Sequence, residues 1–278
     1  MDMLLLVCLP VAVGVLIGVL SGLLGIGGGT IMVPVFRLAF GLNPLVSTAT
    51  SLFTIIPTSI SGAVSHLKGK TCVPALGLAM GLGGAVTSPL GVWLSGISPT
   101  WLVMLAAALI IGGSAVNMLV KAAKAKPAKA SDPAAKGAPA APAAAVATAV
   151  PKLSRKQLLI GVAIGLGAGV MSGYVGVGGG FIMVPLMLSL IHIPMKVASG
   201  TSLIAILILA IPGTVENGFA GNIGFLTGIS VAVGSIPGAV AGSFLVRKVP
   251  ERALRFIFGG FLIVAAIVLF LNEFGILG

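Results

Sequence analysis

Residues Gly18–Phe36 read GVLSGLLGIGGGTIMVPVF, and residues Gly169–Met187 read GVMSGYVGVGGGFIMVPLM. The two stretches are identical at twelve of nineteen positions, and each residue of the second lies 151 positions after its partner in the first. Both are runs of glycine inside apolar sequence. A duplicated apolar segment interrupted by glycine is typical of transporters built from two repeats, whose site lies where the broken helices meet.

The composition places the chain in a membrane. Apolar residues make up 58% of the 278 residues and charged residues only 8%, and the mean hydropathy is +1.21. A soluble protein of this size could not bury so much apolar surface. Apolar stretches of about 20 residues, the length that crosses a bilayer as a helix, fill most of the chain. We therefore predict an all-α polytopic membrane protein.

The chain divides into two membrane repeats, residues 1–120 and 157–278, joined by residues 121–156. This linker is dominated by Ala, Pro and Lys and shows no apolar period, so we expect a disordered connector, although it could also bind a partner. The expected helical segments are Leu4–Leu24, Thr30–Phe40, Val46–Ser65, Val73–Ser95 and Thr100–Val120 in the first half, and Leu158–Val175, Phe181–Ile191, Val197–Val215, Ile223–Val246 and Ala253–Leu271 in the second.

The segment after each glycine run has about a dozen residues, too few to cross an apolar layer of about 30 Å. Each half is therefore predicted to contain one broken re-entrant hairpin and three transmembrane helices, about eight helices in all. Because three crossings is an odd number, the second repeat should be inverted relative to the first.

The basic residues support the same topology. Most Lys and Arg of the +11 net charge lie in loops and in the linker, which favours membrane topology over nucleic-acid binding. With the linker in the cytoplasm, the loop of Lys68 and Lys70, the loop of His192 and Lys196, and the cluster from Arg247 to Arg255 also lie inside. Both termini are then predicted outside, and the N-terminal apolar run, which no basic residue precedes, should be retained.

The glycine runs carry the predicted chemistry. In hydrocarbon, a broken helix is tolerated only where its backbone lines a cavity or is buried in protein, and glycine lets a ligand approach the N–H groups. Two helix N-termini that converge at the midplane would form an anion site; a purely structural crossing is the alternative. The expected binding residues are Gly25, Gly27, Gly28, Gly29 and Thr30 in the first half, and Gly176, Gly178, Gly179, Gly180 and Phe181 in the second.

Other glycines recur every four residues on single helix faces, as in Gly14, Gly18 and Gly22, and are expected to pack helices closely. Pro34 and Pro185 should end or kink the short helices.

A second repeated feature is a block of hydroxyl residues, TATSL at Thr48–Leu52 and SGTSL at Ser199–Leu203, again 151 positions apart. Thr50, Ser51, Thr201 and Ser202 are candidate donors to an oxyanion, or they bond back to their own helices. Candidate gating or coupling residues are Arg37, His66, Glu216 and Asn217. Arg37 either lies deep in the bundle or extends to an interface.

The pair of glycine motifs, each followed by Met-Val-Pro and a Thr-Ser-Leu block, resembles the TauE/SafE sulfite exporter family, also called the toluene sulfonate uptake permease family. The resemblance covers both membrane halves but not the linker. It implies an eight-helix carrier of sulfur-containing anions in a bacterial inner membrane. It also assigns the family's glycine and small polar motifs to the positions named above.

We therefore expect a secondary transporter of sulfite, organosulfonates or related anions, in which rocking of the inverted halves alternates access. A passive anion channel, or a carrier of another small organic anion, is the alternative. No nucleophile, acid pair or metal-ligand motif suggests an enzyme, and Cys8 and Cys72 have no metal or redox spacing. We expect no cofactor, no metal and no nucleic acid; the lipid bilayer is the constant partner. A coupling ion (proton or sodium) and a homodimer are left open.

Overall fold

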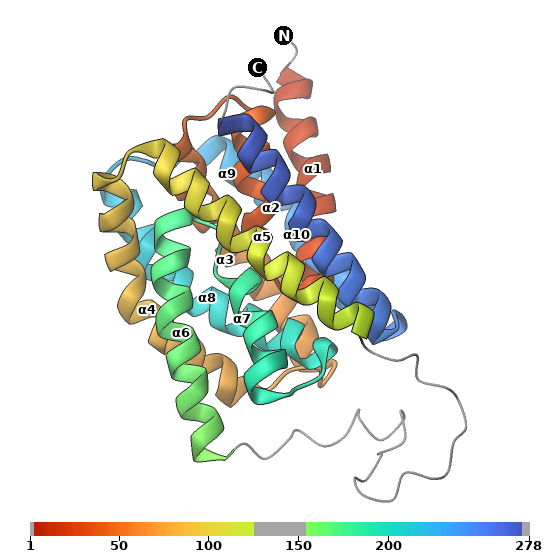
Figure 1. Cartoon of the computed structure of the whole chain (residues 1–278). Coiled ribbons are helices and arrows are strands. Elements are labelled where there is room, and N and C mark those ends of the chain that lie inside the picture. The colour runs from red at the N-terminus through yellow and green to blue at the C-terminus, as the bar shows by residue number, and fades with distance from the viewer. Residues whose placement is uncertain (1–2, 125–153, 274–278) are drawn as a thin grey trace, which may run out of the picture.

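The computed structural model describes residues 3–124 and 154–273, so most of the predicted linker lies outside the described residues. Within these ranges the chain forms only helices (Figure 1). They are α1 (Met3–Leu24), α2 (Gly29–Leu38), α3 (Pro44–Lys68), α4 (Pro74–Ile97), α5 (Thr100–Lys124), α6 (Arg155–Val175), α7 (Gly180–Leu186), the π-helical turn η1 (Met187–Ile191), α8 (Met195–Phe219), α9 (Phe225–Lys248) and α10 (Glu251–Glu273).

Six of the described helices are long and apolar enough to cross a membrane: α3, α4, α5, α6, α8 and α9. The apolar parts of α1, α2 and the α7–η1 pair are shorter, at Cys8–Leu24, Gly29–Leu38 and Gly180–Ile191. Helix α10 covers the last segment predicted as a span; it has 23 residues and begins with the charged residues Glu251, Arg252 and Arg255 in its first five positions. The all-α polytopic class predicted from the composition is confirmed.

Several helices begin before their apolar stretch because polar residues cap them. Helix α3 starts at Pro44, and the Asn43 side chain accepts a hydrogen bond from the Val46 N–H at 2.8 Å. Helix α6 starts after Ser154, whose capping box includes Gln157. Proline is preorganised for the first helical turn, and capping side chains satisfy unpaired N–H groups. Hydropathy alone therefore placed both starts too late.

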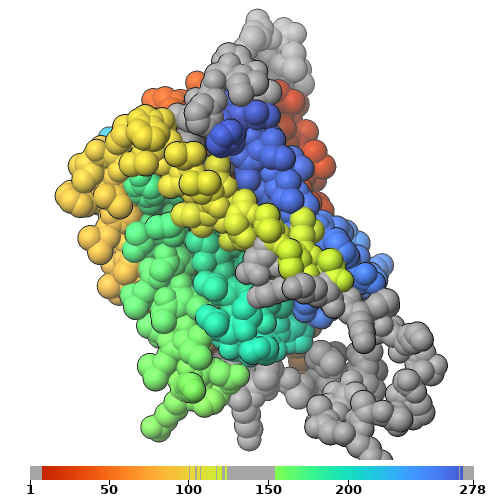
Figure 2. Space-filling view, in the orientation of Figure 1, coloured from red at the N-terminus to blue at the C-terminus, as the bar shows by residue number. Residues whose placement is uncertain are grey.

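The two halves are interleaved. Helix α1 packs mainly on α9 of the other half, and α6 packs mainly on α4; α5 pairs with α10, and α3 with α8 at the centre. Figure 2 shows α5 lying diagonally across one face beside α10. In Figure 1, α1 runs downward from the end where α10 finishes, whereas α6 runs upward from the opposite end.

The glycine faces allow this close pairing. A Cβ added at Gly18 of α1 would lie 2.3 Å from the Ser235 carbonyl oxygen of α9, and one at Gly238 would lie 2.3 Å from the Val15 carbonyl oxygen. On the other side, a Cβ at Gly169 of α6 would lie 2.2 Å from a backbone oxygen of α4. No side chain fits at such distances, so the predicted packing role of these glycines is confirmed.

The prolines of the short helices have different effects in the two halves. Pro34 lies inside α2, which continues to Leu38, so it does not end that helix. Pro185 lies one residue before the end of α7, and the chain then widens into the π-helical turn, where Ser189 Oγ donates to the Pro185 carbonyl at 2.6 Å. Proline removes a backbone donor and crowds the preceding turn, which agrees with this local widening.

Candidate functional site

The two glycine runs are breaks with the same backbone conformation. The residues with positive φ are Gly25 (72°), Gly27 (72°) and Gly28 (84°) in the first half, and Gly176 (73°), Gly178 (80°) and Gly179 (69°) in the second. The three glycines of the second half lie 151 positions after those of the first, at equivalent positions of the repeat. A left-handed backbone costs L residues energy but not glycine, so the sequence requires glycine at each of them. The predicted interruption of both helices is present.

The two breaks lie directly against each other. A Cβ added at Gly29 would lie 2.6 Å from the carbonyl carbon and oxygen of Val177. In the other half, a Cβ at Gly180 would lie 2.7 Å from the Gly25 carbonyl oxygen and 2.8 Å from Ile26 Cα. The backbone of each half therefore touches the break of the other, which only a residue without a side chain permits.

Two isoleucines close the space around the crossing. Ile55 of α3 and Ile206 of α8 occupy equivalent positions of the two halves, and both are fully buried. Each approaches the breaks of both halves: the Cβ positions of Gly27 and Gly178 have both isoleucines as near neighbours. The crossing is thus packed with hydrocarbon on the sides from which these residues approach.

The short helices begin at the breaks without a side-chain cap. Gly28 precedes α2 and Gly179 precedes α7, and the first N–H groups of neither helix donate a hydrogen bond to a capping side chain. The first N–H groups of a helix have no acceptor within the helix, and the helix dipole gives this end a partial positive charge. Two uncapped N-termini from opposite halves therefore begin beside the crossing.

The serines of the two hydroxyl blocks bind the breaks of the opposite half. Ser202 Oγ donates to the Gly25 carbonyl at 2.6 Å and also lies 2.8 Å from the Ser199 carbonyl. Ser51 Oγ donates to the Gly176 carbonyl. Since a hydroxyl has one proton, these serines use theirs on protein carbonyls in this conformation. Their direct contact with substrate stays a prediction.

The threonines of the blocks hold the loops before two spanning helices. Thr201 Oγ1 accepts from the Val73 N–H at 2.9 Å, and Thr50 Oγ1 accepts from the Gly224 N–H at 2.9 Å. Val73 and Gly224 precede α4 and α9. Both bonds connect the two halves. This role of the threonines was not predicted from the sequence. Thr201 also bonds back to its own helix at Val197, as one alternative proposed.

Three hydroxyls in and beside the breaks have no hydrogen-bond partner in the described structure: Ser21 Oγ, Thr30 Oγ1 and Ser172 Oγ. All three residues are fully buried, and the Cβ position of Gly28 lies 3.7 Å from Ser21 Cβ. A buried donor without a partner is costly unless a ligand or water meets it. Ser21 and Ser172 were missed as candidates, although both belong to the repeated motif and lie 151 positions apart.

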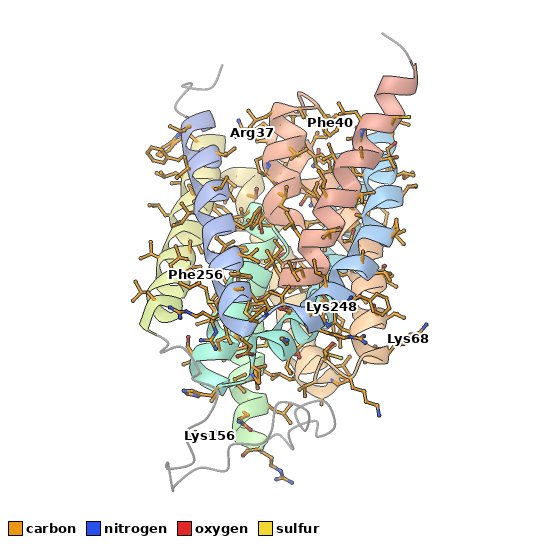
Figure 3. All side chains as sticks on the ribbon, turned by 90° about the vertical axis from the view of Figure 1, so that its right-hand side faces the viewer. Arg37, Phe40, Lys68, Lys156, Lys248 and Phe256 are labelled. Carbon is orange, nitrogen blue, oxygen red and sulfur yellow. The ribbon has the colours of Figure 1, made fainter. Side chains whose placement is uncertain are left out.

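The four candidate gating residues do not come together. Figure 3 places Arg37 at the end of the molecule opposite Lys68, and Arg37 is half-buried, which agrees with the interface alternative. His66 is buried near the Lys68 end, with Nε2 3.0 Å from the Gly22 carbonyl and Nδ1 2.7 Å from Thr71 Oγ1. A coupling role for these residues stays a prediction.

Glu216 and Asn217 lie near the C-terminal end of α8. The Asn217 side chain is buried and donates to the Gly213 carbonyl at 2.8 Å. Glu216 is half-buried, and its Oε2 has no hydrogen-bond partner in the described part of the chain. Over residues 3–124 and 154–273, no three His, Cys, Asp or Glu side chains gather where they could hold a metal ion.

The fold and the paired breaks define a multi-pass α-helical membrane protein with two interleaved halves. The family model described as sulfite exporter TauE/SafE matches residues 10–269. The chain belongs to that family. No solved structure matches it.

Curated relatives are similar over most of their length. The probable membrane transporter protein YunE of Bacillus subtilis is 29% identical over 253 residues, covering 88% of this chain and 90% of the relative. The probable membrane transporter protein YdhB of the same organism is 26% identical over 241 residues, covering 86% and 90%. A probable membrane transporter protein of Xylella fastidiosa is 25% identical over 261 residues, covering 91% of each chain. Family and relatives together describe a membrane transporter of the TauE/SafE type.

Proposed function

We propose that this protein is a secondary transporter of sulfur-containing anions, such as sulfite or organosulfonates, and that it holds the anion at the two glycine breaks. The family name and the transporter relatives support the class. The proposal assigns a bacterial inner membrane, with the Lys-rich end in the cytoplasm and both termini outside, because basic loops stay on the cytoplasmic side.

The main support for an anion site is that uncapped helix N-termini and buried hydroxyls without a partner lie close together at the crossing. Helices α2 and α7 begin at the crossing without a side-chain cap, and Ser21, Thr30 and Ser172 each have a buried hydroxyl without a partner in the described structure. All of these groups can donate to an oxyanion. No Lys or Arg atom is among the three nearest neighbours of the Cβ positions of the break glycines, so dipoles and neutral donors would hold the anion and still release it.

The first break is the more polar of the two. Thr30 starts α2, whereas its counterpart in α7 is Phe181, which is fully buried and has no side-chain donor. Ser21 and Ser172 lie one turn before their respective breaks, so Thr30 is the donor that distinguishes the first break. We therefore assign the sulfonate or sulfite oxygens mainly to the first break, with Phe181 against an apolar part of the substrate.

The remaining candidate residues position the breaks. Ser51 and Ser202 fix the break carbonyls, and Thr50 and Thr201 fix the adjoining loops. Substrate entry requires Ile55 and Ile206 to withdraw, which a rocking motion of one half against the other would achieve. The described conformation would then be an occluded state between the two open states.

The test is binding of sulfite, thiosulfate, sulfate, taurine, sulfoacetate and toluene sulfonate to the purified protein. Thr30→Val and Ser21→Ala should weaken binding of the preferred anion about tenfold each, as expected for a lost hydrogen bond to a charged group. Both variants remove an unpartnered buried hydroxyl, so they should fold at least as well as the parent. Thr214→Val is the matched control because its Oγ1 is also unpartnered but lies near the end of α8.

Unchanged affinity in folded Thr30→Val and Ser21→Ala would refute the site. Equal losses in Thr214→Val would show that the effect is not local. Counterflow in proteoliposomes separates a carrier from a channel: preloaded unlabelled anion should accelerate uptake of labelled anion, whereas a channel would show no such exchange.

A further inference from the structure

A groove between α3 and α9 lies at the end of the molecule that carries the lysines, and none of the break glycines lines it. It has a volume of about 330 Å³ and is lined by Ser61, Val64, Ser65, Lys68, Val240, Phe244 and Arg247. This volume is near the lower limit for sites that hold small ligands, about 300 to 1,000 Å³. Figure 3 places Lys68, Lys156 and Lys248 at this end, which we call the basic end.

The groove opens sideways toward the surface that faces lipid. The Val64 and Phe244 side chains on its two walls are 43% and 54% exposed, and Ile60 and Leu245 beside them are also exposed. Two of its serines bond across to α9: Ser65 Oγ pairs with Ser243 Oγ, and Ser61 Oγ donates to the Ile236 carbonyl.

The Arg247 guanidinium is held in place at one end of the groove. It lies over the Phe244 ring, 5.2 Å from its centroid, and Nη2 donates to the Ser65 carbonyl at 3.4 Å. Gly69 leaves the room it needs, since a Cβ there would lie 1.9 Å from Nη2. An arginine stacked on an aromatic ring keeps its other donors available for a phosphate group.

The charge of this groove is not neutralised by the protein. Within the described ranges, neither Lys68 nor Arg247 forms an ion pair with a carboxylate; the recorded salt bridge joins Arg255 to Glu251. Lys196 adds a further positive charge, because its Nζ donates to the Arg247 carbonyl at 3.0 Å. Lys68 and the positioned Arg247 lie beside apolar walls, an arrangement complementary to an anionic headgroup with an attached acyl chain.

An exact repeat would place an equivalent pair of cations at the opposite end of the molecule, but the equivalent residues are uncharged. The positions equivalent to Lys68 and Arg247, 151 residues later and earlier, are Phe219 and Gly96. Phe219 is 91% exposed. The two cations are therefore a feature of one end and not a consequence of the repeat.

We propose that this groove binds an anionic phospholipid, with its phosphate on Lys68 and Arg247 and an acyl chain against Val64, Val240 and Phe244. Basic pockets between transmembrane helices are suited to lipid headgroups, because each nearby cation adds electrostatic attraction to an anionic lipid. The site is independent of what the protein transports, so its test stands apart from the substrate experiments.

The experiment is native mass spectrometry of the full chain in detergent, titrated with phosphatidylglycerol and with phosphatidylcholine of the same acyl chains. The parent should retain one phosphatidylglycerol in preference to phosphatidylcholine. Lys68→Gln/Arg247→Gln should weaken that binding about 30-fold, the loss expected for two interfacial cations. Arg155→Gln/Lys156→Gln removes the same charges at the basic end of α6 and should bind as the parent does.

A second variant tests the apolar part without touching the charges: Val64→Trp, at an exposed position, should fill the groove and also displace the lipid. Parent-like binding by the folded groove variants, or an equal loss in the α6 control, would overturn the proposal. So would complete displacement of phosphatidylglycerol by millimolar sulfite or inorganic phosphate, which would indicate a vestibule for free anions. If the parent instead forms a dimer without bound lipid, and only the groove variants are monomeric, the groove binds a second copy of this chain and the proposal is wrong.

Discussion

The hydrogen bond from Ser51 to the Gly176 carbonyl is the most direct test of how the two halves hold each other's breaks. Ser51→Ala removes the hydroxyl from a fully buried position of α3 and leaves the carbonyl of the opposite break without this donor. The side chain loses one oxygen and no carbon, so little cavity is created. The change therefore isolates a single contact between the repeats.

The expected cost follows from the surroundings of the carbonyl. A buried polar group left unpaired costs about 1 to 3 kcal/mol, whereas hydrogen bonds between transmembrane helices average about 0.6 kcal/mol and reach about 1.7. Because Gly176 is buried where the halves cross, a value near the upper part of the membrane range is expected. We predict a loss of about 1 to 2 kcal/mol, or a few degrees in Tm.

The assay is thermal unfolding of purified protein in detergent, compared with Ser59→Ala. Ser59 lies on the same helix and is equally buried, but its hydroxyl has no partner in the described structure. Its removal should cost nothing or stabilise slightly. If Ser51→Ala and Ser59→Ala unfold at the same temperature, the interlocking hydrogen bond contributes no stability and our account of the serine blocks is wrong.

Three further predictions concern packing, a thiol and topology. Gly169→Ala should destabilise the protein by about 1 to 3 kcal/mol in the same unfolding assay, because the added Cβ would overlap a carbonyl of α4. Gly167→Ala is the control: its Cβ would have no atom within 4 Å, so the change should be neutral or stabilising. Burial raises the pKa of the Cys72 thiol to about 11. The rate of its alkylation, followed by mass spectrometry, should therefore rise tenfold per pH unit from pH 7 to about 10, because only the thiolate reacts. A rate that levels off above pH 9 would contradict this. In intact cells, a cysteine introduced by Asn222→Cys should react with an impermeant maleimide, whereas one introduced by Lys68→Cys should not. The reverse pattern would show that the predicted orientation in the membrane is wrong.

Much of the fold followed from composition and from the repeat. Apolar stretches predicted every helical segment, and the glycine triplets marked both breaks, because glycine adopts a left-handed backbone without the steric cost that a side chain brings. The ends were less well predicted where a cap or proline, such as Asn43 before Pro44, extends a helix into polar sequence.

The partners of the site could not be predicted in the same way. Which carbonyl Ser51 would meet depends on how the halves interleave, and a one-dimensional pattern does not contain this arrangement. Ser21 and Ser172 were visible as identical residues of the motif, but their significance lies in having no partner, which only the packed structure reveals. The groove joins Lys68 and Arg247, which are 179 positions apart; the charge pattern predicts both on the same side, but only the packing of α3 on α9 brings them together.

The exchange of partners between the halves has a consequence for biosynthesis. Helix α1 emerges first, but the surface that matches its glycine ridge is on α9, which is synthesised some 200 residues later. Until then α1 lacks its main packing partner, so we expect the partly synthesised chain to be more open to proteolysis and to chaperone binding than the complete one. Neither half should mature alone, whereas two separately expressed halves should rescue each other.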